Sequence, residues 1–167
     1  MATKQRTAFE TRNDLPADSR ERLVELLNAR LADTFDLYSQ VKQAHWNVKG
    51  PDFIALHELF DKINEDVEEY VDLTAERVVQ LGGIAEGTAR LAIKASKLAE
   101  YPAGISAGKD HVDALSSALA TYGKLVRAAI DEADKLGDAD TADIFTEISR
   151  GTDKWLWFLE AHLQSNQ

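Results

Sequence analysis

Apolar residues recur every three or four positions over four long stretches of the chain, and no segment alternates as a strand would. This spacing is typical of helices that bury one face. We expect the first two helices over about residues 17–48 and 52–81, because Gly50-Pro51 and Gly82-Gly83 end them. The inward positions of the second helix are predicted to be Leu56, Phe60, Ile63, Val67, Tyr70, Thr74, Val78 and Leu81.

The second half of the chain repeats this pattern after a long connection. Two more helices are expected, over about residues 106–136 and from Asp138 or Asp140 onward. Roughly twenty-five residues precede them, with a short helical segment near Thr88–Leu98 and a break at Tyr101-Pro102. A connection of this length indicates a crossover rather than a hairpin. The pattern therefore predicts an all-α, ferritin-like four-helix bundle whose long crossover carries a short extra helix.

Composition narrows the class of protein. A chain of 167 residues suits one domain, and we expect a flexible tail over residues 1–15 and the bundle over 16–165. Without cysteine, neither disulfides nor thiolate metal sites are available. We expect no contact with membranes and a cytoplasmic location, because the sequence shows neither a membrane span nor a secretory signal. The 29 acidic and 19 basic residues give a net charge of -10, which favours cations over nucleic acid.

Two pairs of candidate metal ligands lie on one stripe of the second helix. His57 and Asp61 are four residues apart, and so are Asp72 and Glu76. At about 100° per residue, Asp61, Asp72 and Glu76 lie about 40°, 60° and 100° around the helix from His57. His45, near the end of the first helix, adds a second imidazole. Imidazole with carboxylate suits ferrous iron or zinc better than calcium or magnesium.

The two pairs are too far apart to hold one ion within a single chain. Asp61 and Asp72 are separated by about 16 Å along the helix axis, whereas metal–ligand bonds are near 2 Å. If two copies of this helix cross antiparallel about a two-fold axis near residues 66–67, each pair faces the other pair of its partner. The spacing therefore predicts two equivalent sites between subunits.

Two other arrangements compete with this shared site. Ferritin-like di-iron bundles carry Glu-x-x-His on their helices, and no histidine of this chain has glutamate three residues before it. The residues found there are Lys42, Ile54, Gly108 and Leu159. Charged pairs four residues apart also occur on ordinary solvated helix surfaces, and spacing alone leaves this second interpretation open.

Several separated motifs resemble the Dps family (DNA-binding protein from starved cells), over residues from about Thr11 to Leu163. They are Lys42-Gln-Ala-His45-Trp46-Asn47, Phe53-Ile-Ala-Leu-His57-Glu58 with Asp61, Asp72-Leu-Thr-Ala-Glu76-Arg77, Gln80-Leu-Gly-Gly83, Asp140-Thr-Ala-Asp143-Ile-Phe, Asp153-Lys154 and Leu156-Trp157-Phe158. The resemblance implies a twelve-subunit shell that oxidises ferrous iron, preferably with hydrogen peroxide, and stores the ferric mineral.

The resemblance also assigns roles to individual residues. His45, His57 and Asp61 of one subunit would bind iron together with Asp72 and Glu76 of its neighbour. His45, Asp61 and Glu76 would be the tight ligands, and zinc is a possible substitute for iron. Trp46 would quench stray oxidising equivalents near the centre, and packing in the core is its alternative role.

Other charged residues are candidates for an ion pore, for mineral nucleation and for DNA binding. Asp138 and Asp143 resemble the acidic ion pore of the family, while Asp138 or Asp140 can also cap the fourth helix. Glu65, Asp66, Glu68 and Glu69 would nucleate mineral if they face the cavity, or form an ordinary solvated face. Lys4, Arg6, Arg12 and the terminal amine, offset by Glu10 and Asp14, give the N-terminal tail a charge of about +2. We expect DNA binding through this tail to be weak and salt-sensitive.

Three classes of function follow. The first is a ferroxidase that stores iron and protects DNA from oxidative damage. The second is a nucleoid-packing protein whose metal binding is incidental, and the third is a helical shell without enzymatic activity that binds zinc. His111 and His162 are expected at surface or packing positions and receive no role.

Overall fold

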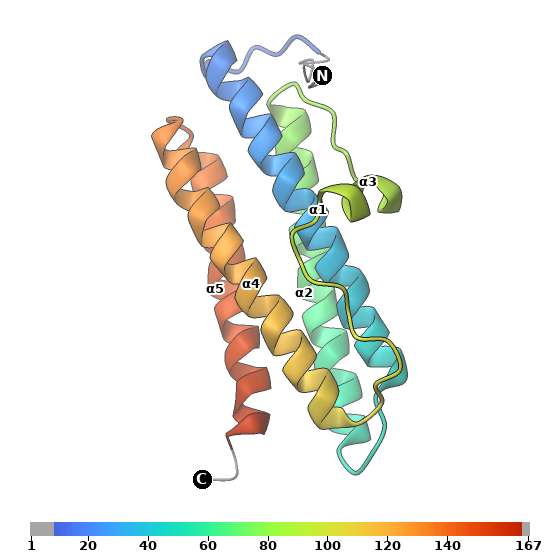
Figure 1. Ribbon diagram of the computed structural model, residues 1–167. Coiled ribbons are helices and arrows are strands. Elements are labelled where there is room, and N and C mark those ends of the chain that lie inside the picture. Colours follow the sequence, from blue (N-terminus) through green and yellow to red (C-terminus); the bar gives the residue numbers. More distant parts are fainter. Residues whose placement is uncertain (1–8, 165–167) are drawn as a thin grey trace.

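Helices account for most of the chain in the computed structural model, which describes residues 9–164. These residues form five helices and no strand beyond one isolated bridge between Lys49 and Ala107. The helices are α1 (Ala17–Asn47), α2 (Phe53–Gln80), α3 (Ala89–Ala95), α4 (Gly108–Lys135) and α5 (Ala139–Leu163). The predicted all-α bundle is confirmed, with helix bounds close to those expected from the sequence (Figure 1).

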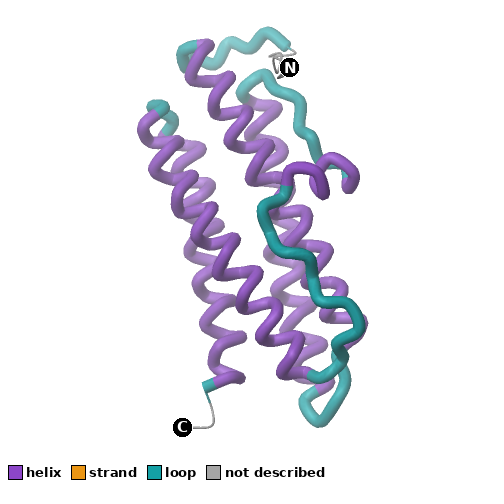
Figure 2. The backbone as a smooth tube through the Cα atoms, viewed as in Figure 1, coloured by secondary structure: helices purple, strands orange, loops and turns teal. Residues whose placement is uncertain are grey.

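The four long helices are arranged as two hairpins. α1 packs along α2, and α4 packs along α5. The crossover between the hairpins carries α3 and runs along α1 toward the start of α4 (Figure 2). Lys49 donates its N–H to the carbonyl of Ser106 over 2.8 Å, which ties the end of the crossover to the α1–α2 turn. The long connection is therefore a crossover, as its length predicted.

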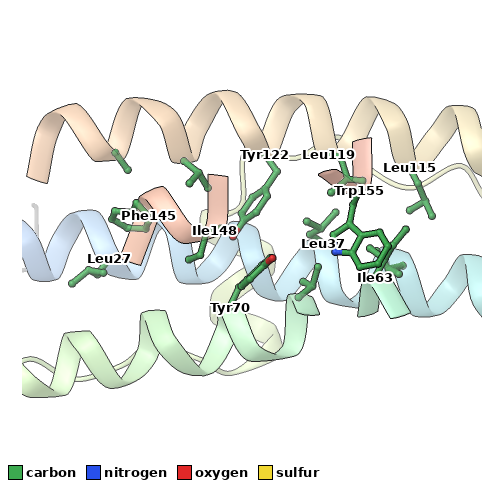
Figure 3. Packing of buried hydrophobic residues seen from close by; sticks show 14 of the residues in the cluster. Leu27, Leu37, Ile63, Tyr70, Leu115, Leu119, Tyr122, Phe145, Ile148 and Trp155 are labelled. Atoms are coloured by element: carbon green, nitrogen blue, oxygen red, sulfur yellow. The ribbon is translucent and has the colours of Figure 1, made fainter. Parts of the chain in front are cut away.

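All four long helices contribute to a single apolar core (Figure 3). Leu27 and Leu37 of α1 and Ile63 of α2 are fully buried. Tyr122 of α4 is also fully buried, and its hydroxyl lies 2.8 Å from the hydroxyl of Thr34, so the polar end of this large side chain is satisfied. Burial raises the pKa of Tyr70, on α2, to about 12.

The turn between α4 and α5 is fixed by two adjacent residues. Gly137 has φ +81°, a left-handed conformation that other residues adopt only with strain. Asp138 caps α5, because its carboxylate accepts a hydrogen bond from the N–H of Thr141. The capping role expected from the sequence is therefore confirmed for Asp138.

Part of the predicted tail lies against the end of α2. Phe9 donates its N–H to the carbonyl of Gly82 over 3.4 Å. The carbonyl oxygen of Phe9 would lie 2.8 Å from a Cβ at position 82, so glycine permits this close approach. Residues 1–8 of the tail, with Lys4 and Arg6, lie outside the described residues. None of the helices in residues 9–164 has the length and apolar character needed to cross a membrane.

Candidate functional site

The two predicted ligand pairs lie at opposite ends of α2 and differ in their surroundings. We call His45, His57 and Asp61 the histidine half-site, and Asp72 and Glu76 the carboxylate half-site. Within the histidine half-site, the rings of His45 on α1 and His57 on α2 are stacked, with centroids 3.8 Å apart and planes inclined by 21°. Helix packing thus brings together two imidazoles that are twelve residues apart in the sequence.

Reciprocal hydrogen bonds fix the orientation of both rings. His45 Nδ1 lies 2.9 Å from the carbonyl oxygen of His57, and His57 Nδ1 lies 2.9 Å from the carbonyl oxygen of His45. Because a carbonyl oxygen only accepts, each Nδ1 carries the proton and donates it. Each neutral ring then keeps a free lone pair on Nε2, which is how protein backbones commonly prepare histidines to bind metals.

Asp61 completes the histidine half-site and carries a partner that the sequence did not reveal. Its Oδ1 lies 3.8 Å from His45 Nδ1 and 2.6 Å from Nζ of Lys42. The hydrogen bond from Lys42 lowers the pKa of Asp61, so the carboxylate is ionised at neutral pH. Lys42 lies three residues before His45, on the same face of α1, and this spacing is the signal that could have identified it.

The carboxylate half-site is exposed, although α2 is firmly held beneath it. Neither Asp72 nor Glu76 has a side-chain hydrogen bond or ion pair within residues 9–164. Next to Glu76, however, the buried Arg77 donates from Nη2 to both oxygens of Asp138, at 2.8 and 2.9 Å, and from Nε to the hydroxyl of Thr141. The end of α2 that carries the two free carboxylates is thus anchored to the start of α5.

Within residues 9–164 of one chain, no group of three or more His, Asp or Glu side chains is arranged to hold a metal ion. The chain brings His45, His57 and Asp61 together and leaves Asp72 and Glu76 at the other end of the helix.

Known proteins share this fold and sequence over nearly the whole chain. The model of the ferritin-like domain matches residues 24–166. A DNA protection during starvation protein of Agrobacterium fabrum is 48% identical over 154 residues, which cover 92% of this chain and 95% of that protein. A second protein of that name, from Brevibacillus brevis, is 34% identical over 83% of this chain and 93% of its own length. The chain belongs to the Dps family.

Solved structures agree with this membership. DpsA14 from Streptomyces coelicolor superposes with a TM-score of 0.91 at 34% identity, covering 97% of this chain and 96% of that one. Dps from Mycobacterium smegmatis, in its tetragonal form, gives a TM-score of 0.90 at 30% identity, with 95% of each chain covered. The Dps resemblance drawn from the sequence motifs is therefore confirmed.

The other residues that the Dps resemblance singled out occupy contrasting environments. Asp138 is 3% exposed and paired with Arg77, whereas Asp143 is exposed. Burial opposes ionisation of Asp138, but the hydrogen bonds from Thr141 and Arg77 outweigh burial and hold its pKa below the usual value of 3.8. Trp46 is 67% exposed, which is incompatible with a place in the core of this chain.

In the acidic run of α2, Glu65, Glu68 and Glu69 are exposed. Asp66 instead accepts a hydrogen bond of 2.8 Å from Nε1 of Trp155, and Lys154 lies 3.7 Å from it. Three of the four carboxylates are therefore available on the surface of the chain.

Arg12, His111 and His162 lie apart from both half-sites in the sequence. Arg12 is exposed. His111 is a packing residue, 1% exposed, with Nδ1 at 2.6 Å from the hydroxyl of Tyr101, and burial lowers its pKa. His162 is exposed near the end of α5 and bonds to the carbonyl of Phe158. Both histidines occupy the packing and surface positions expected of them.

Proposed function

We propose that this chain is an iron-storage ferroxidase that oxidises ferrous iron, preferably with hydrogen peroxide, at sites shared between two subunits. Membership in the Dps family brings a general role in iron storage and DNA protection. The observation that carries the finer proposal is the histidine half-site, where two imidazoles are locked with Nε2 free beside an ionised aspartate. Nitrogen and carboxylate ligands of this kind suit ferrous iron, and zinc can take the same place.

The exposed face of α2 supports a site completed by a second copy. An antiparallel crossing about a two-fold axis near residues 66–67 places His57 opposite the partner's Glu76 and Asp61 opposite the partner's Asp72. The same register places Ile54, 61% exposed, opposite the partner's Val79, which is 56% exposed in this chain. Apolar contacts at both ends of the crossing would then bury surfaces that one chain leaves open.

The chemistry assigned to the site is a two-electron reduction of peroxide. Two ferrous ions each give up one electron, the O–O bond of hydrogen peroxide breaks, and two protons complete two water molecules. Placing both ions at one centre lets the pair of electrons reach one peroxide, so hydroxyl radical is not released. His45, Asp61 and the partner's Glu76 would bind most tightly, with His57 and the partner's Asp72 binding more weakly or through water. Trp46, exposed beside His45, would intercept stray oxidising equivalents.

Entry and storage of iron follow from the acidic surface. We assign the pore-lining role to the exposed Asp143, while the buried Asp138 holds the start of α5 in place. The exposed Glu65, Glu68 and Glu69 would nucleate ferric mineral inside a dodecamer built from two-fold dimers. We place this assembly in the cytoplasm.

Binding to DNA is a second candidate function, because the Agrobacterium fabrum relative is named for DNA protection. The contacts would come from Lys4, Arg6 and Arg12 in twelve tails, each weak and salt-sensitive. A gel shift at several salt concentrations, repeated after deletion of residues 1–12, tests this role. If the truncated protein still shifted the DNA, the tail would not be the DNA-binding segment.

Complementation between two inactive variants tests the shared site. One variant carries His57→Ala with Asp61→Ala, and the other carries Asp72→Ala with Glu76→Ala. Each alone should lose nearly all peroxide-driven oxidation of ferrous iron in stopped-flow measurements. After co-refolding, each mixed dimer regains one intact site of two, so random assortment should restore about a quarter of the wild-type activity.

The outcome separates three arrangements. A site within one chain would give no recovery, because every chain lacks some of its ligands. Undiminished oxidation in either variant alone would show that the substituted residues are not ligands. Wild-type protein that binds zinc but does not accelerate oxidation would be a shell without enzymatic activity.

A further inference from the structure

Lys42 contacts an oxygen atom of Asp61 that also lies near the His45 ring. Its Nζ lies 2.6 Å from Asp61 Oδ1, and the same Oδ1 is the atom 3.8 Å from His45 Nδ1. An ion bound by Asp61 and by the free Nε2 of a neighbouring histidine would need lone pairs of this carboxylate. The ammonium group therefore already holds an oxygen of the carboxylate that a metal ion at the half-site would use.

The Lys42–Asp61 pair differs from an ordinary surface ion pair in its position. It joins α1 to α2 across nineteen residues of sequence, and the Lys42 side chain is 26% exposed. The Arg127–Asp153 pair joins α4 to α5 at 2.9 Å, with both side chains more than half exposed and no histidine pair beside it. Position, and not the mere presence of an ion pair, distinguishes Lys42.

We propose that Lys42 is a displaceable cation, which holds Asp61 in the absence of metal and is exchanged for ferrous iron when the site is loaded. This inference rests on the proposed function. The ammonium is a single charge on a flexible four-carbon stem, so it can leave Asp61 without any backbone movement. A divalent ion attracts the carboxylate about twice as strongly at equal distance and also gains the imidazole ligands, so it can win the exchange.

Two consequences follow for the site. Asp61 remains oriented toward the histidines before iron arrives, which keeps the half-site organised. Iron must also compete with a resident charge, so weakly bound or monovalent cations are rejected. Lys42 thus acts as a specificity-determining residue through Asp61, without being a ligand itself.

Binding of Co(II) to the assembled, metal-free protein tests this exchange by isothermal titration calorimetry. Lys42→Met removes the charge and keeps the length of the chain. It should tighten binding at the histidine half-site about fivefold, because a competing ion pair of this exposure contributes about 1 kcal/mol. Lys62→Met is the matched control, since Lys62 is the exposed neighbour of Asp61 in the sequence and makes no ion pair within the described residues. It should change the affinity less than twofold.

Two further variants guard against indirect effects. Lys42→Arg keeps the charge and should bind Co(II) with nearly wild-type affinity. If Lys42 only filled space, the Co(II) affinity would not depend on whether its replacement is charged. Lys42→Gln replaces the methionine variant if that one fails to assemble. In ferrous oxidation, removal of the charge should lower the half-saturating iron concentration and leave the maximal rate nearly unchanged.

Unchanged or weaker Co(II) binding by both neutral variants would overturn the exchange. An equal gain in the Lys62→Met control would also overturn it, because the effect would then be one of general charge. The proposed function fails separately, if Co(II) binding to the wild-type protein is unaffected by His57→Ala with Asp61→Ala. In that case Co(II) does not bind at the histidine half-site, and Lys42 has no metal ion with which to compete.

Discussion

The two half-sites, which lie at opposite ends of α2, are organised in opposite ways. In the histidine half-site the predicted ligands are held in place by stacked rings, by reciprocal backbone hydrogen bonds and by the contact between Lys42 and Asp61. In the carboxylate half-site, Asp72 and Glu76 extend into solvent, and order comes from Arg77 beneath them. One half-site presents oriented imidazoles, and the other presents free carboxylates on a fixed support.

This difference suits a site assembled from two chains. Nitrogen ligands must present a particular lone pair, so their rings gain from orientation before metal arrives. Carboxylates have two oxygens and tolerate adjustment, so they can close over an ion after the subunits meet. We expect the prepared half to determine which metal is accepted, and the open half to complete the coordination.

The largest loss of unfolding free energy is expected when Arg77, which supports the carboxylate half-site, is replaced. Arg77→Met would leave Asp138 charged, 3% exposed and without its cation. Loss of one partner of a buried ion pair costs about 3–5 kcal/mol of unfolding free energy, measurable by urea denaturation. Arg127→Met is the control, because its partner Asp153 is exposed, and it should cost less than about 1 kcal/mol. Equal losses would show that Arg77 is not a special anchor.

The same anchor should give a defined dependence on pH. Because the pKa of folded Asp138 lies below its usual value of 3.8, ionised Asp138 stabilises the protein above that pH. The contribution is lost as pH falls through the lower pKa of the folded state. Asp138→Asn should therefore cost about 2 kcal/mol at neutral pH, because hydrogen bonds to the charged carboxylate are lost. The gap from wild type should narrow as the pH falls below 3.8. Asp140→Asn is the control, because its side chain is 83% exposed, and it should change the unfolding free energy by less than about 0.5 kcal/mol.

In metal-free protein, substitutions in the two half-sites should lower the unfolding free energy by different, smaller amounts. His57→Ala removes one hydrogen bond to the His45 carbonyl and the stacked ring, at a cost of about 1 kcal/mol. Glu76→Ala removes an exposed side chain without a polar partner in the described chain and should cost less than about 0.5 kcal/mol. Thermal unfolding of both variants measures the difference. Equal costs would contradict the view that only the histidine half-site is organised before metal binds.

Helix periodicity was sufficient to predict the fold and its boundaries. The helix expected over 52–81 is found at Phe53–Gln80, because glycines stop the helices and apolar spacing determines the buried face. The cap at Asp138 was predicted for the same local reason. These features depend on residues close together in the sequence.

Contacts between helices were harder to predict. Periodicity places Lys42 and Asp61 on particular faces, but it does not give the axial shift between α1 and α2 that brings them to 2.6 Å. The bond from Arg77 to Asp138 spans sixty-one residues and depends on the packing of α5 on α2. The reciprocal histidine bonds have the same origin, so only the family resemblance placed His45 beside His57. Pairing across the two-fold axis remains a prediction.

The smallest effect on stability is expected at Trp46, which follows His45 of the histidine half-site in the sequence. Because Trp46 is 67% exposed, Trp46→Phe should change the unfolding free energy of the metal-free chain by less than about 0.5 kcal/mol.

The proposed role of Trp46 appears only during turnover. Phenylalanine is much harder to oxidise than tryptophan, so it cannot take over this role. Repeated cycles of iron and peroxide should therefore inactivate Trp46→Phe faster than wild type, with more oxidised side chains detected by mass spectrometry. Trp157→Phe is the matched control, since Trp157 is 63% exposed and lies on α5, away from the sequence neighbourhood of His45. Equal inactivation of both variants would show that Trp46 gives the histidine half-site no particular protection.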